Sequence, residues 1–361
     1  MNRMLMTSRH LVSLACLALV ALTAAPVLGQ SKTSNAEESA AHELFKYLPT
    51  DSSSLAVIDV KAVRASPYFD RATDYLQSKG QVQGLTKLLQ SDKEAIEDQS
   101  VDRVAVGFPA ATGRSAPERS TAVLAGTFNE SSLKSIFESE VEGFKSVELD
   151  GGLTGFKKEN TVAVLLDKKH LLLVTGPESY RSRALNTARG KAKSLADGAL
   201  PTSILKELDT SRGIWMVNSS NSVPGAAEQG IVEIGLALGV ADDLEIQAVT
   251  RSNSEKSAKE LEGQLSSARS SNADNPMVKM LGIGPLLTNL EHRRKGSIIV
   301  ATTSMTSTEV DALIKRLEEM MGGSGSKPLQ IPGDRSSADS SEDASKKEAP
   351  SGDDGAEADF N

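Results

Sequence analysis

Two short basic clusters, each with a histidine, are the residues of this sequence best suited to chemistry. The clusters are Lys168-Lys169-His170 and His292-Arg293-Arg294-Lys295. Lysine and arginine attract phosphate and carboxylate groups, and histidine exchanges protons near neutral pH. On a chain with a formal charge of −8 these clusters are local positive spots. They indicate contact with an anionic surface such as phosphate-bearing lipid, although exposed turns are usually just solvated.

The sequence contains none of the short motifs that mark common active sites. It has no G-x-S-x-G elbow, no G-x-x-x-x-G-K-[ST] phosphate loop and no H-E-x-x-H zinc helix. With four histidines and one cysteine, a His/Cys metal site would need widely separated residues. We therefore predict no catalytic residues, no metal site and no cofactor, and a protein that is more a binding module than an enzyme.

Length and composition exclude several classes of protein. The 361 residues are 39% hydrophobic and 24% charged, which allows a sizeable core and excludes wholesale disorder. One cysteine cannot build a disulfide scaffold. The acidic balance argues against a nucleic-acid partner.

The first 29 residues have the three parts of a secretory signal peptide. Arg3 and Arg9 precede an apolar run, and Val27-Leu28-Gly29 offers small residues for cleavage before Gln30. Cys16 does not fit lipid anchoring, because Ser13 stands where a lipobox usually has leucine. The pattern predicts a periplasmic or extracellular protein without a transmembrane helix after cleavage.

The rest of the chain is predicted to be α+β, with two similar antiparallel-sheet units whose helices pack on one face. Strands at 101–108 and 121–128 are followed by a helix and a hairpin at 162–175. Strands at 231–239 and 244–250 are followed by a helix and a hairpin at 287–304. The predicted organisation is a signal peptide (1–29), a linker with a short helix (30–48), two units (49–200 and 201–321) and a disordered acidic tail (322–361).

In this scheme the two basic clusters are the tips of corresponding hairpins. If both tips point the same way, they form one basic patch. A hairpin tip through residues 291–296 also requires a strand at 287–290 before it, paired with a strand at 297–304.

The segment that follows the predicted linker resembles uncharacterised exported proteins of environmental bacteria. The resemblance rests on Tyr47-Leu-Pro-Thr-Asp-Ser-Ser-Ser-Leu-Ala-Val-Ile-Asp-Val60 and Val63-Arg-Ala-Ser-Pro-Tyr-Phe69. It implies a loop that leads into a strand and then a helix. No chemistry is attached to it, and no site residues can be carried over.

We therefore expect an exported, non-enzymatic envelope protein that binds an unknown envelope protein or an anionic surface. Two alternatives stay open: a hydrolase with an unrecognised active site, and a carrier of an apolar ligand. A histidine buried beside both a carboxylate and a serine would favour the hydrolase. A cavity between sheet and helices would favour the carrier.

Overall fold

The computed structural model of the chain describes residues 42–66, 69, 99–110, 118–140, 143–149, 153–198, 202–219, 226–239, 243–272, 278 and 283–322. The chain separates into two units, residues 1–320 and 321–361, and the elements below belong to the first, apart from the last residues of α12. The predicted signal peptide lies outside the described residues. So does the predicted tail, except for Gly322.

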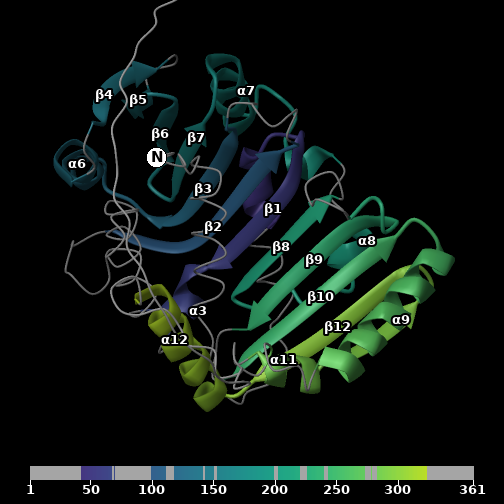
Figure 1. The fold of residues 1–361 in the computed structure, drawn as a ribbon. Coiled ribbons are helices and arrows are strands. Elements are labelled where there is room, and N and C mark those ends of the chain that lie inside the picture. Colours follow the sequence, from purple (N-terminus) through teal and green to yellow (C-terminus); the bar gives the residue numbers. More distant parts are fainter. Residues whose placement is uncertain are drawn as a thin grey trace, which may run out of the picture. The chain divides into compact units, whose positions relative to one another are not determined.

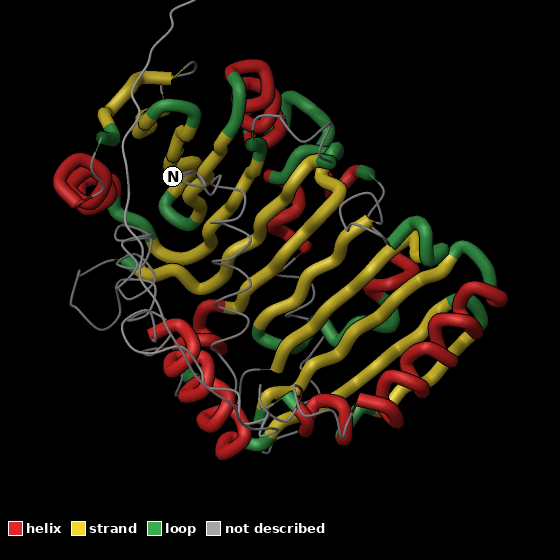
Figure 2. The backbone as a smooth tube through the Cα atoms, viewed as in Figure 1, coloured by secondary structure: helices red, strands yellow, loops and turns green. Residues whose placement is uncertain are grey.

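The described strands form one continuous twelve-stranded sheet in the order β11-β12-β10-β9-β8-β1-β2-β3-β7-β6-β5-β4 (Figure 1). Figure 2 shows these strands side by side along the sheet. Together with the helices they confirm the predicted α+β class. The strands are β1 (Ser52–Asp59), β2 (Ser100–Pro109), β3 (Ser120–Thr127), β4 (Lys145–Leu149), β5 (Leu153–Lys158), β6 (Thr161–Asp167), β7 (His170–Thr175), β8 (Ile214–Ser219), β9 (Ile231–Gly239), β10 (Leu244–Ser252), β11 (Glu291–Lys295) and β12 (Ile298–Met305).

Helical segments connect and cover these strands. They are η1 (Phe45–Tyr47), α3 (Val60–Arg64), α6 (Glu130–Ser135), the π-helical turn η2 (Ile136–Glu140), α7 (Glu178–Ala188), η3 (Leu195–Asp197), α8 (Thr202–Leu205), α9 (Glu255–Asn272), α11 (Gly284–Thr288) and α12 (Ser307–Gly322).

The central strands carry continuous apolar runs because both of their faces are buried. In β1, the consecutive residues Leu55, Ala56 and Val57 are all 4% exposed or less. Consecutive strand residues point to opposite faces, so such a run needs cover on both sides. By contrast, the edge strand β4 has no fully buried residue.

Two sets of core side chains identify the two faces of the sheet. Val57, Trp215 and Val217 belong to one hydrophobic cluster, and we call their side face A. Ile58 and Ile214 alternate with them and belong to the clusters on the opposite side, face B. Because β1 and β8 pair antiparallel at the middle of the sheet, the core extends across both halves.

Helical segments cover both faces, whereas the sequence predicted helices on one face. Face A is covered by η1, α7, η3 and α8, which contribute Phe45, Tyr180, Leu195 and Ile204. Face B is covered by α6, η2, α11 and α12. The prediction was wrong on this point, because the continuous apolar runs of the central strands require two covered faces.

The segment directly before β1 is part of the core on face A. Leu44, Phe45 and Leu48 are at most 2% exposed. The ring of Phe45 meets that of Trp215 edge-on, with centroids 6.2 Å apart. The Leu195 N–H donates to the carbonyl of Leu48 at 2.7 Å. Residues 44–48, predicted to end a linker with a short helix, thus contribute core side chains.

The residues that carry the resemblance to exported proteins make structural contacts. Pro49 forms an isolated bridge with Ser194, and Asp51 forms an ion pair with Arg183 at 2.5 Å. The Arg64 guanidinium donates to the Val101 carbonyl at 2.9 Å. These contacts connect the start of β1 and the end of α3 to the rest of the sheet.

Outward from the β1–β8 pair, both halves of the sheet have the same strand order. One half reads β1-β2-β3-β7-β6, and the other reads β8-β9-β10-β12-β11. The halves also differ, because β4 and β5 occur only in the first among the described strands. In addition, the helix that follows the last hairpin of each half covers a different face. This helix is α7 on face A in the first half and α12 on face B in the second. We retain the similarity of the two units as a proposal.

Two local predictions were wrong. Residues 287–290 are not a strand, because α11 runs from Gly284 to Thr288 and the basic stretch itself is β11. The spacing Ser252-x-x-Glu255 predicts that Ser252 caps α9, but Ser252 is the buried last residue of β10. The cap of α9 is Ser254, whose hydroxyl accepts from the Ser257 N–H at 3.1 Å.

Replacing Leu48 by alanine should lower the free energy of unfolding by about 2–5 kcal/mol, the usual effect of truncating a fully buried leucine. Urea denaturation of the purified protein measures this loss. The exposed Glu43 lies in the same segment, and Glu43→Ala should change the value by about 0.5 kcal/mol or less. Equal, small effects of both substitutions would show that this segment is not part of the core.

Candidate functional site

The two basic clusters lie at opposite ends of the strands. All described strand pairs are antiparallel. β7 and β12 are seven positions apart in the sheet, so they run in opposite directions. Each begins at the turn of its hairpin, which places the two turns at opposite ends of the sheet. The two hairpin turns therefore do not point the same way, and the two clusters do not form one basic patch.

The second cluster is an edge strand rather than a turn tip, and its cations are paired. Arg293 and Lys295 point to face A, where both contact the Glu207 carboxylate at 3.2 and 2.8 Å. Arg294 contacts Glu262 of α9 at 2.9 Å. Charged side chains along an edge strand also protect it from pairing with other chains. These ion pairs give Arg293, Arg294 and Lys295 a structural role.

Glu207 is held ionised by its two cations. The hydrogen bond from Lys295 lowers the pKa of Glu207 most, and Arg293 adds to it against the opposing effect of burial. The pKa therefore lies below its ordinary value of 4.5. A carboxylate with a depressed pKa stabilises the folded state above that ordinary value, and this contribution is lost as the pH falls through the folded-state pKa.

Glu207→Gln should therefore destabilise the protein at pH 7 by about 1 kcal/mol or less, since the pairs are partly solvated. The difference in free energy of unfolding between this variant and the unmodified protein should be smaller at pH 3, where the Glu207 carboxylate of the unmodified protein begins to be protonated. Urea denaturation at both pH values measures it. The exposed Glu228 provides the control, and Glu228→Gln should have little effect at either pH. The same loss for Glu207→Gln at pH 7 and pH 3 would contradict a role of its charge.

His170 of the first cluster is held against the N-terminal segment. Its side chain is 17% exposed, and its ring lies 4.9 Å from the ring of Tyr47. Its Nδ1 is 2.9 Å from the Asp167 carboxylate and 3.3 Å from the Tyr47 hydroxyl. Partial burial raises the pKa of Asp167, but hydrogen bonds from His170 and from the Lys169 N–H outweigh it and lower that pKa overall.

This arrangement does not form a catalytic relay. In a Ser-His-Asp relay the carboxylate and the nucleophile bind different ring nitrogens of the histidine. Here Asp167 and Tyr47 both approach Nδ1 of His170. The contacts therefore fix the ring in place and connect the β6–β7 turn to the segment before β1.

His292 contacts a serine in an orientation unsuited to activating it. The Ser266 hydroxyl donates to the Glu262 carbonyl at 3.0 Å and lies 3.3 Å from Nε2 of His292. A hydroxyl has one proton to donate, so the contact with His292 requires an N–H donor on the ring. Within the described residues, neither histidine is hydrogen-bonded to both a carboxylate and a serine side chain.

An open groove of about 740 Å³ lies between α6 and the β6–β7 turn. Lys168 is the residue of the predicted set that lines it. The other lining residues were not predicted: Thr127, Phe128, Asn129, Glu130, Ser131, Lys134 and Leu165. The groove thus combines two cations, one carboxylate and several hydroxyl and amide groups.

Backbone contacts hold the two sides of this groove together. The Phe128 N–H donates to the Lys168 carbonyl at 2.9 Å, and the Gly126 N–H donates to the Lys169 carbonyl at 3.0 Å. Asn129, a residue type that favours helix N-caps, caps α6 by accepting from the N–H groups of Ser131 and Ser132. Lys168 and Lys134, 34 positions apart in the sequence, therefore reach the same groove.

The groove cations differ from those of β11 in their pairing. Lys134 and Lys168 are exposed, and neither forms an ion pair with another described residue. Lys169 is also exposed and unpaired in the described part of the chain, but it does not line the groove. Among the residues predicted to contact an anionic surface, the cations without an ion pair in the described structure are therefore Lys168 and Lys169 of the β6–β7 turn.

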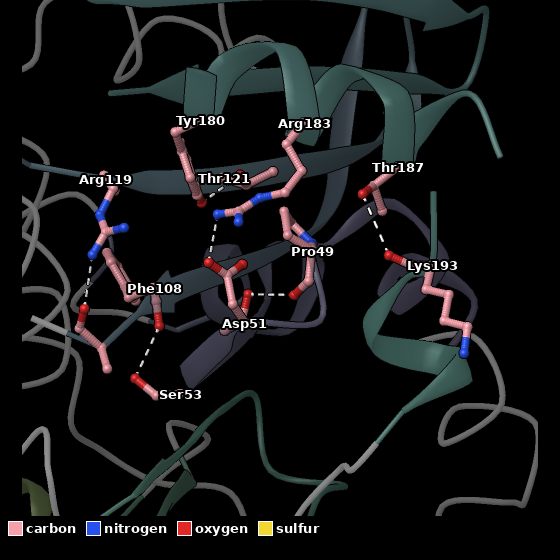
Figure 3. A network of polar contacts seen from close by, with 12 residues as sticks. Pro49, Asp51, Ser53, Phe108, Arg119, Thr121, Tyr180, Arg183, Thr187 and Lys193 are labelled. Atoms are coloured by element: carbon pink, nitrogen blue, oxygen red, sulfur yellow. Dashed lines mark hydrogen bonds and ion pairs between the residues drawn. The ribbon is translucent and has the colours of Figure 1, made fainter. Parts of the chain in front are cut away.

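A second polar cluster, shown in Figure 3, has a structural role. The buried Tyr180 hydroxyl shares a hydrogen bond of 2.9 Å with Thr121, and Arg183 reaches across to Asp51. Burial raises the pKa of Tyr180 to about 12, so this hydroxyl stays protonated. Arg119 of the same cluster donates to the Ala110 carbonyl at 2.9 Å. These contacts join α7 to β3 and to the start of β1.

Neither a metal centre nor a membrane-spanning helix is found in the part of the chain that the structure describes. No three His, Cys, Asp or Glu side chains in these ranges are grouped to hold a metal ion. No helix there combines the length and the apolar character needed to cross a bilayer.

Comparison with known proteins gives a distant structural match. No protein-family model and no curated protein matches the chain. Crystal form I of TP0453 aligns with a TM-score of 0.47 and 11% identity, covering 76% of this chain and 96% of that chain. Crystal form III of TP0453 aligns with a TM-score of 0.45 and 12% identity, covering 75% and 96%.

Proposed function

We propose that this chain is an exported, non-enzymatic binding protein of the cell envelope, and that it binds a phosphate-bearing envelope component in the groove between α6 and the β6–β7 turn. The observation that carries this proposal is the pair Lys134 and Lys168, two unpaired cations from different elements at one groove. Like charges at one site repel each other, and a bound anion removes that repulsion. The predicted signal peptide supports the location.

The chemistry of the groove fits a phosphate ester. Ammonium groups bind phosphate as point charges, and hydroxyl groups add hydrogen bonds to its oxygens. Thr127 supplies such a hydroxyl beside Lys134 and Lys168, whereas the Ser131 hydroxyl donates to Asn129 Oδ1 at 2.6 Å. The hydrolase alternative gains no support from the two histidines, because among the described residues neither is hydrogen-bonded to both a carboxylate and a serine side chain.

Vesicle binding tests this proposal. The mature protein should bind phosphatidylglycerol vesicles in a salt-sensitive way and should not bind phosphate-free digalactosyldiacylglycerol vesicles. A lysine near an anionic surface contributes about 1 kcal/mol, so the variant Lys134→Gln/Lys168→Gln should bind about 20–30-fold more weakly. Flotation with quantified protein measures the partition.

Lys169→Gln is the matched control, because it removes one positive charge from the same turn but outside the groove. It should weaken binding less than twofold, whereas Lys168→Gln alone should weaken it about fivefold. Equal losses for these two variants would indicate general surface attraction and contradict a groove site. No binding of the unmodified protein to any phosphate probe would end the proposal.

A further inference from the structure

The carboxylate of Glu130 lies in the same groove as the two lysines and is also unpaired in the described structure. Glu130 and Lys134 are four residues apart on α6, with the acid on the N-terminal side. This is the favourable spacing and order for an ion pair on a helix. No ion pair between them is present among the described residues, so the carboxylate and the ammonium both remain available to a ligand.

The groove therefore presents charges of both signs, one carboxylate and two ammonium groups. A simple anion such as inorganic phosphate would be attracted by Lys134 and Lys168 but repelled by Glu130. A ligand that carries a phosphate and an ammonium satisfies all three groups. Charge complementarity of this kind selects between ligands more strongly than it adds affinity.

We propose that the groove selects a zwitterionic phosphoethanolamine group, with its phosphate between Lys134 and Lys168 and its primary ammonium at Glu130. This inference rests on the proposed function, because it names the chemical class of the ligand for the same groove. The hydroxyl of Thr127 and the partly exposed side chain of Leu165 also line the groove and are available to the ligand. The group can come from a lipid headgroup or from a soluble ester.

The test compares vesicles that carry equal fractions of phosphatidylethanolamine or phosphatidylglycerol in digalactosyldiacylglycerol. The unmodified protein should prefer phosphatidylethanolamine by at least fivefold, because phosphatidylglycerol offers a phosphate without an ammonium. In Glu130→Gln the preference should disappear, with weaker binding to phosphatidylethanolamine and stronger binding to phosphatidylglycerol. A general loss of folding would weaken binding to both lipids and can be recognised by circular dichroism.

Glu138→Gln serves as the matched control, since Glu138 is an exposed acid in the following π-helical turn and does not line the groove. This variant should keep the lipid preference. Competition by free phosphoethanolamine, but not by inorganic phosphate, would support the same chemistry and show whether a soluble ester suffices. If free phosphoethanolamine competes while no vesicle binds, the ligand is a soluble ester rather than a lipid.

The outcomes separate the two proposals. If the unmodified protein binds both lipids equally and Glu130→Gln does not change this, the groove does not select phosphoethanolamine. The proposed binding of a phosphate-bearing component would still stand. Absence of binding to either lipid, to phosphoethanolamine and to inorganic phosphate overturns the proposed function itself.

Discussion

The structure depends on covering both faces of its central strands. β1 and β8 meet at the middle of one sheet, and their apolar residues alternate between face A and face B. An antiparallel sheet can leave one face in water only when its strands alternate apolar and polar residues. These strands do not, so helical segments from distant parts of the sequence must pack on each side. The segment before β1 is one of them, which makes Phe45 and Leu48 part of the core although they precede the first strand.

Polar contacts then fix the periphery of this framework. Asp51 with Arg183, Glu207 with Arg293 and Lys295, and Tyr47 with His170 each join segments more than eighty residues apart. A side chain engaged in such a contact is poorly suited to bind a ligand, because binding must first replace the existing partner. This distinction separates the paired basic residues of β11 from the unpaired lysines at the groove.

Much of the framework could be predicted from sequence, since periodicity and capping act locally. The runs at 101–108, 121–128, 231–239 and 244–250 are strands, and Asn129 and Thr306, residue types that favour helix N-caps, cap α6 and α12. The sequence predicts a turn at the basic stretch 291–295, because charged residues are typical of turns. They also occur on edge strands, and only the tertiary pairing with β12 distinguishes the two.

The candidate site was only partly predictable for a similar reason. Lys168 stood out in the sequence as one of a basic run, but Lys134 is a single lysine on a helix surface. The two reach one groove because β3 pairs with β7 and the end of β3 bonds to the β6–β7 turn. Glu130 likewise carries no signal of its own, since acids are common in the first turn of a helix. Such long-range placement follows from strand order, which local patterns do not specify.

Hydrogen–deuterium exchange on the intact protein, resolved by peptide, measures which strands form the most stable part of the sheet. If burial on both faces makes β1 and β8 the stable centre, their amides should exchange slowest, through global unfolding, and the peptide containing Leu48 should be protected with them. The edge strands β4 and β11 should exchange fastest among the strands. Exchange of β1 and β8 as fast as that of the edges, or an unprotected segment at residues 44–48, would show that two-sided burial does not stabilise this part of the sheet.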